Sequence, residues 1–217
     1  MPDYAYDPPD VPLDILFQDD WLLVANKPAG LLSVPGKDPG KGDCLIERLR
    51  VPFPETLLVH RLDCDTSGVI VFARNKAAQG NLGQQFEKRQ TKKVYAARLW
   101  GRLDPAEGRV DLPLCVDWPN RPRQHVNHEI GKPAITDWRV VRHEGDTTRV
   151  RLMPQTGRSH QLRVHMLSLG HPILGDPIYA EGPALQGWPR MMLHAESLRL
   201  RHPETGVSMT FSAPVPF

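Results

Sequence analysis

Strand-like stretches outnumber helix-like stretches in this sequence, and the two kinds do not alternate in a regular order. Stretches rich in β-branched and aromatic residues predict strands at 69–75, 92–101, 107–114, 132–141, 148–154, 191–203 and 209–214. A parallel, doubly wound sheet needs a helix between successive strands, and most of these strands follow one another without a helix. The sequence therefore predicts an α+β fold with a mixed, mostly antiparallel central sheet and flanking helices.

The remaining elements are predicted from turn residues and from apolar spacing. Residues 14–35 read as two short strands around the turn 26–30, which carries Lys27. Apolar residues at helical spacing predict helices over 44–50, 76–89 and 156–170. The acidic, proline-rich start predicts a flexible N-terminal arm (1–14) in front of one domain (15–217).

The composition excludes some classes of protein and leaves others open. No apolar stretch is long enough to span a bilayer, and the N-terminus lacks the features of a secretory signal. Three widely spaced cysteines without a CxxC motif favour the reducing cytoplasm. The net charge is only +2, but the basic residues are 19 Arg and 8 Lys, and guanidinium groups suit phosphates and base faces. From composition alone, RNA binding and a genomic bias toward arginine explain this excess equally well.

The motifs of common cofactor and metal sites are missing. The sequence contains neither GxxxxGK[ST] nor a GxGxxG that follows a strand, so nothing indicates a nucleotide cofactor. His160 and His165 are five residues apart in the predicted helix, which separates them by about 140° and prevents them from sharing a metal as an i, i+4 pair would. We expect neither a metal nor a cofactor.

The stretch VHRLDCDTSG (59–68) places Asp63 between basic residues and a Thr-Ser-Gly turn. Asp63 and Asp65 point the same way in an extended segment, so a glycosidase-like acid/base couple is one interpretation. The interpretation we favour is that Asp65 supports the turn through hydrogen bonds to the backbone.

A second basic cluster, TGRSHQLRVH (156–165), carries Arg163. An arginine that points inward from a helix needs a buried carboxylate partner, and Asp63 is a natural candidate. Such a pair would lower the pKa of Asp63 and keep it ionised. From spacing alone, a purely structural ion pair is the simpler interpretation.

Taken together, these motifs resemble those of the RluA family of pseudouridine synthases. HRLDCDTSG (60–68) resembles the catalytic motif HRLDxxTSG. NKPAGLLSVPG resembles the amino-terminal motif, KKVYAARLWG the tyrosine motif and GRSHQLRVHM the arginine motif, while HPILGDPIY and MLHAESLRLRHP resemble the closing segments. The resemblance runs from Ile15 to Pro214. It implies the pseudouridine synthase fold, with a central catalytic cleft.

The resemblance also implies a reaction and its catalytic residues. The family converts uridine in RNA to pseudouridine without a redox change or the loss of a group, so the chemistry needs no cofactor. Asp63 matches the catalytic aspartate, Tyr95 the tyrosine that stacks on the target base, and Arg163 the arginine that pairs with the aspartate. Attack on the base, attack on the sugar and removal of a ribose proton are all open to Asp63.

Other residues match groups that would handle the RNA. The target uridine must leave its stack, and Arg61 matches the arginine that fills the vacated space. We expect Leu162 to wall the base pocket, and Lys27 and Arg158 to hold phosphates. The residues expected to contact an RNA loop lie in a proline-bounded loop and are Asn120, Arg121, Arg123 and Gln124.

The stretch CVDWPNRPRQHV and the compact length resemble family members that modify both 23S rRNA and a tRNA anticodon stem-loop. Larger relatives carry an additional small RNA-binding domain in front of the first motif, and we expect none here. The alternatives are a single-substrate rRNA or tRNA synthase, a non-catalytic RNA-binding protein of the same fold, and a nucleoside or glycoside hydrolase that uses Asp63 with Asp65. Because no coiled-coil seam or long apolar strand edge is apparent, we expect a monomer.

Overall fold

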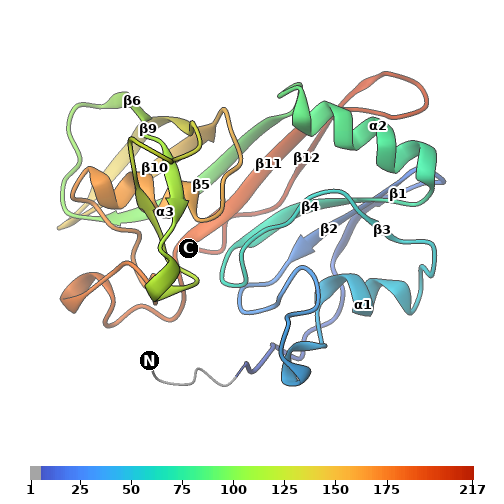
Figure 1. The fold of residues 1–217 in the computed structure, drawn as a ribbon, viewed down its shortest axis with the longest axis horizontal. Helices are drawn as coiled ribbons and strands as arrows, with labels where there is room; N and C mark the ends of the chain where they lie inside the picture. Colours follow the sequence, from blue (N-terminus) through green and yellow to red (C-terminus); the bar gives the residue numbers. More distant parts are fainter. Residues whose placement is uncertain (1–5) are drawn as a thin grey trace. The chain divides into compact units, whose positions relative to one another are not determined.

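The structure is a computed structural model that describes residues 6–217 of the chain. These residues divide into two compact units (Figure 1). Of the described residues, 6–91 and 195–215 form unit 1, and 92–194 with 216 and 217 form unit 2. Each unit has a hydrophobic core of its own. The division of the chain into an arm (1–14) and one domain (15–217) stays a prediction.

Unit 1 is built on strands in the order β1–β2–β4–β11, with β3 beside β4 and β12 beside β11. The pairings β1–β2, β2–β4, β3–β4 and β11–β12 are antiparallel. The whole of β4 is buried, which explains its nearly continuous apolar sequence. The strands are β1 (Ile15–Gln18), β2 (Leu22–Lys27), β3 (Leu57–Leu58), β4 (Ser67–Ala73), β11 (Leu193–Arg201, in this unit from Ala195) and β12 (Ser208–Ser212).

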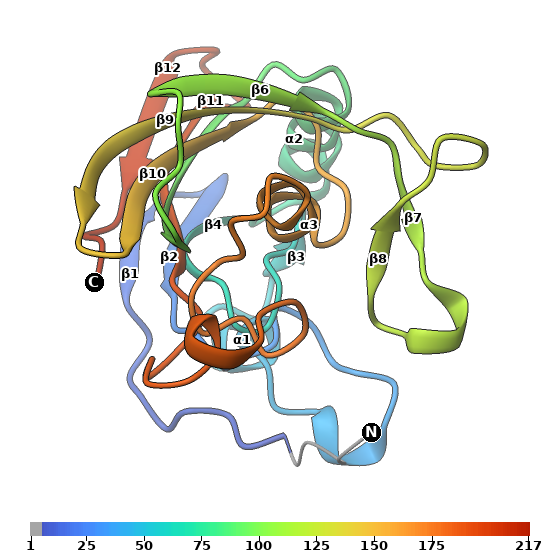
Figure 2. The same cartoon turned by 90° about the vertical axis from the view of Figure 1, so that its left-hand side faces the viewer.

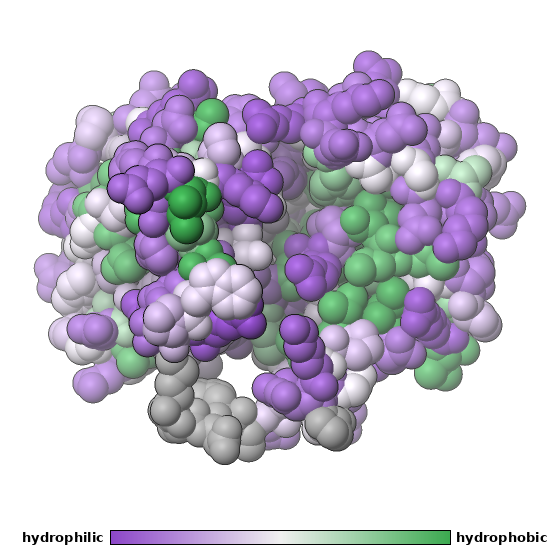
Figure 3. All heavy atoms as spheres, in the orientation of Figure 1, coloured by the Kyte–Doolittle hydropathy of each residue, from purple (hydrophilic) through white to green (hydrophobic). Residues whose placement is uncertain are grey.

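Helix α2 (Lys76–Glu87) packs on this sheet through one narrow face. The side chain of Asn75 caps its first turn by accepting the N–H of Ala78 at 2.8 Å. Ala78 and Leu82, one helical turn apart, are buried against apolar residues of β4 and β11. The surface of α2 seen in Figure 3 is largely hydrophilic. The other helical elements of unit 1 are α1 (Leu45–Arg50) and the 3-10 turn η1 (Pro39–Lys41).

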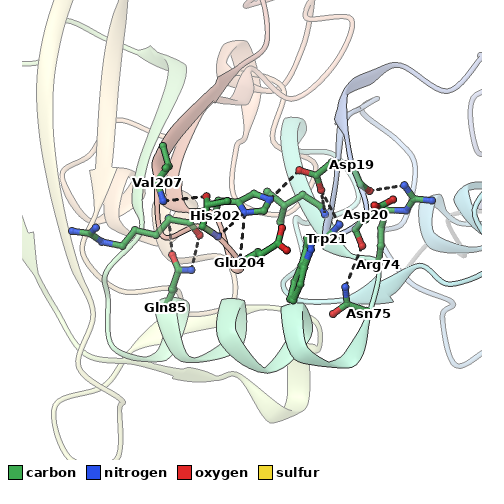
Figure 4. Close-up of polar contacts among 12 residues, drawn as sticks. Asp19, Asp20, Trp21, Arg74, Asn75, Gln85, His202, Glu204 and Val207 are labelled. Carbon is green, nitrogen blue, oxygen red and sulfur yellow. Dashed lines mark hydrogen bonds and ion pairs between the residues drawn. The ribbon is translucent and has the colours of Figure 1, made fainter.

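Asp19 ties the β1–β2 turn to the turn that follows β11 (Figure 4). Its Oδ1 accepts the N–H groups of Trp21 at 2.8 Å and Leu22 at 2.7 Å, and its Oδ2 lies 2.9 Å from His202 Nε2. Burial raises the pKa of Asp19, but the bonds from Leu22 and Trp21 and the His202 ring outweigh it, so this pKa lies below its ordinary value. These contacts join segments far apart in the sequence.

Unit 2 contains a four-stranded antiparallel sheet in the order β5–β10–β9–β6, and a separate hairpin of β7 and β8. Figure 2 shows the strands of the larger sheet curving over α3, and the β7–β8 hairpin projecting from the rest of the unit. The elements are β5 (Lys92–Trp100), β6 (Glu107–Asp111), β7 (Leu114–Val116), η2 (Trp118–Asn120), β8 (Gln124–Val126), β9 (Ile135–Glu144), β10 (Thr147–Pro154), α3 (Gln161–Ser168) and η3 (Gly182–Ala184).

The predicted α+β class with a mostly antiparallel sheet is confirmed. Each stretch that was predicted as a strand from β-branched and aromatic residues contains a strand of the structure. Within residues 6–217, no helix has the length and apolar character that crossing a membrane requires.

The prediction of two strands around the turn 26–30 is wrong. The strands β1 and β2 are joined at residues 19–21, and β2 runs into the predicted turn and ends at Lys27. Residues 31–35 form no strand, because the carbonyls of Leu31, Leu32 and Ser33 accept hydrogen bonds from Lys27, Leu45 and Ile46 instead of from a neighbouring strand.

The helix that was predicted over 156–170 is shorter and begins at Gln161. His160 precedes it in a left-handed conformation, with φ at +54°. The Thr156 hydroxyl does not cap the helix: it donates to the Gln161 side chain at 2.7 Å and accepts the N–H of Ile135 at 2.9 Å. Since His160 lies outside the helix, the angle that was used to separate it from His165 does not apply.

The predicted flexible arm (1–14) is attached to unit 1 over its described part. The Tyr6 hydroxyl donates to the Asp43 carbonyl at 2.8 Å and accepts the N–H of Leu32 at 3.0 Å. The carbonyl of Pro9 accepts a hydrogen bond from Arg48 at 2.8 Å. Residues 1–5 of the predicted arm lie outside the described residues.

Candidate active site

Asp63 lies in the connection between β3 and β4. Its carbonyl accepts the N–H of Thr66 at 3.1 Å, which closes a turn directly after it. Gly68 then enters β4 at φ +109°, where an added Cβ would collide with the backbone of Ala195 in β11. Only glycine fits such a position, so the Thr-Ser-Gly sequence lets the Asp63 turn join a buried strand.

Lys27 fixes the residue that follows Asp63. Its side chain is completely buried, and its ammonium group donates to the carbonyls of Pro28 at 2.9 Å, Leu31 at 2.6 Å and Cys64 at 2.8 Å. The N–H of Gly30 bonds to the same Cys64 carbonyl at 3.0 Å. The expectation that Lys27 holds a phosphate is therefore wrong: its ammonium group is enclosed and directed at backbone carbonyls.

Ser33 fixes the residue that precedes Asp63. Its hydroxyl donates to the Leu62 carbonyl at 2.8 Å and accepts the Leu62 N–H at 3.1 Å. Asp63 thus lies between two anchored residues, Leu62 and Cys64. Both anchors come from the segment 27–33, which forms part of the amino-terminal motif.

The two residues before Leu62 differ in role. His60 Nε2 accepts the N–H of Val71 at 3.1 Å, and its ring stacks on Phe86 with 4.5 Å between ring centroids. These contacts make His60 a support of the segment that leads to Asp63. Arg61 is exposed, so its guanidinium group is accessible to a stacked base.

In unit 2, Tyr95 and Leu162 belong to one apolar cluster. Tyr95 lies on β5 opposite Leu152 of β10 and is partly buried. It packs against the cluster that contains Leu152 and Leu162, and Leu162 is 7% exposed. The two residues that were expected to line the base pocket therefore belong to the same apolar region of unit 2. Their contact with a base stays a prediction.

Arg163 is buried and paired with a carboxylate of its own unit. Its Nε lies 2.7 Å from Asp176 Oδ2, and its Nη2 lies 2.6 Å from Oδ1. Asp176 Oδ1 also accepts the N–H groups of Ile178 and Tyr179. This two-point ion pair fixes the plane of the guanidinium group. The pairing of Arg163 with Asp63 stays a prediction.

Asp176 was not among the site residues predicted from the sequence. The residue lies within HPILGDPIY, a stretch that was quoted only as a closing segment of the family pattern. An acidic residue between apolar ones was the available signal. Spacing could not identify its partner, because Asp176 and Arg163 are joined by tertiary structure rather than by periodicity.

The other polar residues of α3 fasten it to β9. The amide of Gln161 donates to Thr136 Oγ1 at 3.0 Å, and His165 Nδ1 lies 2.9 Å from the same oxygen. His165 Nε2 donates to the Leu112 carbonyl at 3.1 Å, so Nδ1 is the acceptor of the Thr136 hydroxyl in the neutral ring. Burial lowers the pKa of His165, which favours this neutral form.

Tyr179 connects the β7–β8 loop to α3. Its hydroxyl accepts the N–H of Gln124 at 2.7 Å and lies 2.8 Å from His160 Nδ1. The guanidinium groups of Arg123 and Arg163 lie 5.1 and 5.0 Å from the centre of its ring. Burial raises the pKa of Tyr179 to about 12, so the phenol stays neutral at physiological pH.

The four loop residues that were expected to contact RNA have different surroundings. The backbone N–H of Gln124 and the side chain of Arg123 hold the loop, since Arg123 also donates to the Ile178 carbonyl. Asn120 donates to both carboxylate oxygens of Asp117, at 3.1 and 3.0 Å. Arg121 is exposed at the loop tip.

Arg158 lies outside this loop, before α3. It is partly buried, and its Nε donates to the Pro133 carbonyl at 3.1 Å. Its contact with a phosphate stays a prediction.

Comparison with known proteins identifies the family. The profile of the family described as RNA pseudouridylate synthase matches residues 21–168, more than half of the chain. The chain belongs to this family. The members are isomerases that act on RNA, so the resemblance found in the sequence and the enzyme class are both confirmed.

The likeness to other pseudouridine synthases extends over the full chain. The protein named dual-specificity RNA pseudouridine synthase RluA from Escherichia coli K12 is 56% identical over 214 residues, which cover 98% of both chains. The Yersinia pestis protein of that name is 52% identical over 94% of this chain and 99% of its own.

Solved structures agree with this assignment. Human RNA pseudouridylate synthase domain containing 1 is 32% identical, with a TM-score of 0.78 over 100% of this chain and 87% of that chain. Human RNA pseudouridylate synthase domain containing 4 is 26% identical, with a TM-score of 0.75 over 94% of this chain and 88% of that one. The pseudouridine synthase fold is thus confirmed.

Proposed function

We propose that this pseudouridine synthase modifies uridines in both 23S rRNA and a tRNA anticodon stem-loop. The observation that carries this proposal is the 56% identity, over 98% of both chains, to a bacterial protein named as a dual-specificity enzyme. A further argument is the short β7–β8 loop with its exposed arginine, which suits the loop of an RNA hairpin. Two hairpins that present similar loops would then be accepted by the same surface.

In the proposed reaction, N1 of the uracil leaves C1′ of the ribose, the uracil turns, and C5 bonds to C1′ in its place. C5 loses its proton and N1 gains one, so atoms and electrons balance without an oxidant or a metal. Asp63 is the proposed catalytic group, as attacking group or as base. Because Lys27 and Ser33 hold the residues on either side of it, the backbone that carries Asp63 is fixed before the substrate arrives.

Tyr95 and Arg163 are the proposed partners of Asp63 in catalysis. Tyr95 would stack on the turned-out uracil, with Leu162 beside it in the same apolar cluster. Arg163 would keep the Asp63 carboxylate ionised, and its pair with Asp176 fixes the guanidinium orientation. Arg61 would fill the space that the uridine leaves, and Arg158 would hold a phosphate.

We further propose a cytoplasmic monomer. Within the described segment, Cys44, Cys64 and Cys115 form no disulfide, which fits a reducing compartment. Sedimentation of the purified protein would reveal a dimer if the monomer proposal is wrong.

The experiment for dual specificity measures pseudouridine formation by the wild-type protein on two separate RNAs, an anticodon stem-loop and a 23S rRNA hairpin, with EDTA present. We expect product on both. Product on only one RNA would replace the proposal by a single-substrate synthase. Free uracil in place of pseudouridine would indicate a hydrolase.

A further inference from the structure

Trp118 is a large aromatic residue held on the outside of unit 2. It lies at the tip of the β7–β8 connection and is 66% exposed. The Arg121 guanidinium group stacks on its indole, with Cζ 3.4 Å from the ring centroid. Exposure of this much apolar surface is unfavourable in the free protein, and a cation stacked on one face leaves the indole suited to a flat, electron-rich ligand.

The loop that carries Trp118 is rigidly built. The Asp117 N–H bonds to the Arg123 carbonyl at 2.9 Å, the Asn120 N–H to the Asp117 carbonyl at 3.1 Å, and the Arg123 N–H to the Asn120 carbonyl at 3.0 Å. The Asn120 side chain closes the same turn on the Asp117 carboxylate. Little conformational entropy would therefore be lost when a ligand stacks on Trp118.

The base of this loop is anchored beside Arg163. The Gln124 N–H bonds to the Tyr179 hydroxyl at 2.7 Å, and the Tyr179 ring also lies against the Arg163 guanidinium group. A ligand stacked at the tip is thereby held at a fixed place relative to Arg163 within unit 2.

We propose that Trp118 and Arg121 form a stacking platform for one unpaired base of the RNA substrate, separate from the target uridine. The base would lie on the indole, and the Arg121 charge would attract the adjacent phosphate. Only a nucleotide in a loop or single strand can present its face in this way, since the bases of a duplex are covered by their neighbours. This platform rests on the proposed function. It adds that the enzyme recognises a second, unpaired nucleotide of the RNA besides the target uridine.

The test compares the binding of two anticodon stem-loops by wild type and Trp118→Ala. One RNA is intact, and the other keeps its ribose and phosphates but lacks the loop bases. Trp118→Ala should bind the intact RNA about 5- to 150-fold more weakly, which corresponds to the loss of one stacked base. It should bind the abasic RNA as wild type does. Trp118→Phe should keep most of the affinity.

Two controls separate stacking from other effects. Val207→Ala removes an exposed apolar side chain from unit 1, where Val207 is 60% exposed, and should not change binding. Arg121→Ala should weaken binding of the intact RNA and also reduce its salt dependence, with the slope of log K against log salt falling by about 0.7.

Three results would overturn the platform. These are binding of the intact RNA by Trp118→Ala within twofold of wild type, equal losses on the intact and abasic RNAs, and a Trp118→Phe variant as weak as Trp118→Ala. Pseudouridine formation by wild type is measured on the same intact RNA. Product from wild type with normal binding by Trp118→Ala would reject the platform and leave the proposed function standing. Absence of product from wild type would reject the proposed function, whatever the platform does.

Discussion

Lys27 shows how a residue far from Asp63 in the sequence can determine where that carboxylate lies. Its ammonium group is buried and satisfies three carbonyls, one of which belongs to the neighbour of Asp63. A buried charge of this kind is stable only because carbonyl oxygens replace its water. Loss of the charge would leave those oxygens without their donor.

We therefore predict that Lys27→Met lowers the free energy of unfolding by about 3 kcal/mol, because buried carbonyls lose a charged donor. Activity should fall further than the loss of folded protein explains, since Cys64 loses an anchor. Urea unfolding and the kcat of the folded fraction measure the two effects. Lys37→Met, at an exposed lysine of the same unit, should change neither. A Lys27→Met variant as active and as stable as wild type would contradict the anchoring role.

His165 is the residue in α3 whose protonation should matter to stability. Its folded pKa lies below the ordinary value of 6.5 because of burial, so the unfolded chain binds a proton more readily than the folded one. Stability should be constant above about pH 7 and fall as the pH drops below 6.5 toward the folded pKa. Urea unfolding from pH 8 to 5 measures this. His165→Gln should flatten the slope in that range, and an unchanged slope would show that other groups cause it.

At the scale of elements, Tyr179 couples the β7–β8 loop to α3. The phenol hydroxyl bonds to the Gln124 N–H and to His160, and the guanidinium groups of Arg123 and Arg163 lie 5.1 and 5.0 Å from the centre of its ring. Removal of the hydroxyl alone tests the coupling, because the ring contacts remain. Since the Tyr179 pKa is about 12, the phenol stays neutral between pH 6 and 9, and its hydrogen bond from the Gln124 N–H should not change in that range.

We predict that Tyr179→Phe loses about 1 kcal/mol for each hydrogen bond and increases hydrogen exchange at the Gln124 amide. Exchange–mass spectrometry of the peptide over 117–126 reads this directly. Tyr6→Phe, which removes a hydroxyl bonded in unit 1, should leave that peptide unchanged. Equal exchange in Tyr179→Phe and wild type would mean that the loop is held without the tyrosine.

For the whole molecule, the elements that the sequence predicted best are those with local signals. Strand β4 follows from its β-branched run, and the end of β5 follows from Gly101, which adopts φ +81°. The start of α3 was predicted too early in the sequence. The Thr156 hydroxyl does not cap the helix, because it forms tertiary hydrogen bonds with Ile135 and Gln161. A cap and a tertiary bond look alike in a sequence.

Within the candidate site, too, some residues were predicted from the sequence and others were not. Asp63, Tyr95 and Arg163 were identified through family motifs, whereas their supports were not. Lys27 was read as a surface cation because most lysines are exposed, and its burial depends on a carbonyl 37 residues away. Asp176 is buried because the fold places it beside Arg163, and no periodic pattern in the sequence indicates this contact.

We propose that Asp63 is the group that isomerises uridine in RNA. The most direct measurement is pseudouridine formation on the anticodon stem-loop by wild type, Asp63→Asn and Asp65→Asn, each checked for folding and for RNA binding. We predict that Asp63→Asn binds RNA and forms no pseudouridine, while Asp65→Asn remains active. Pseudouridine formed by Asp63→Asn at the rate of wild type, or an equal loss in both variants, would show that Asp63 does not have this role.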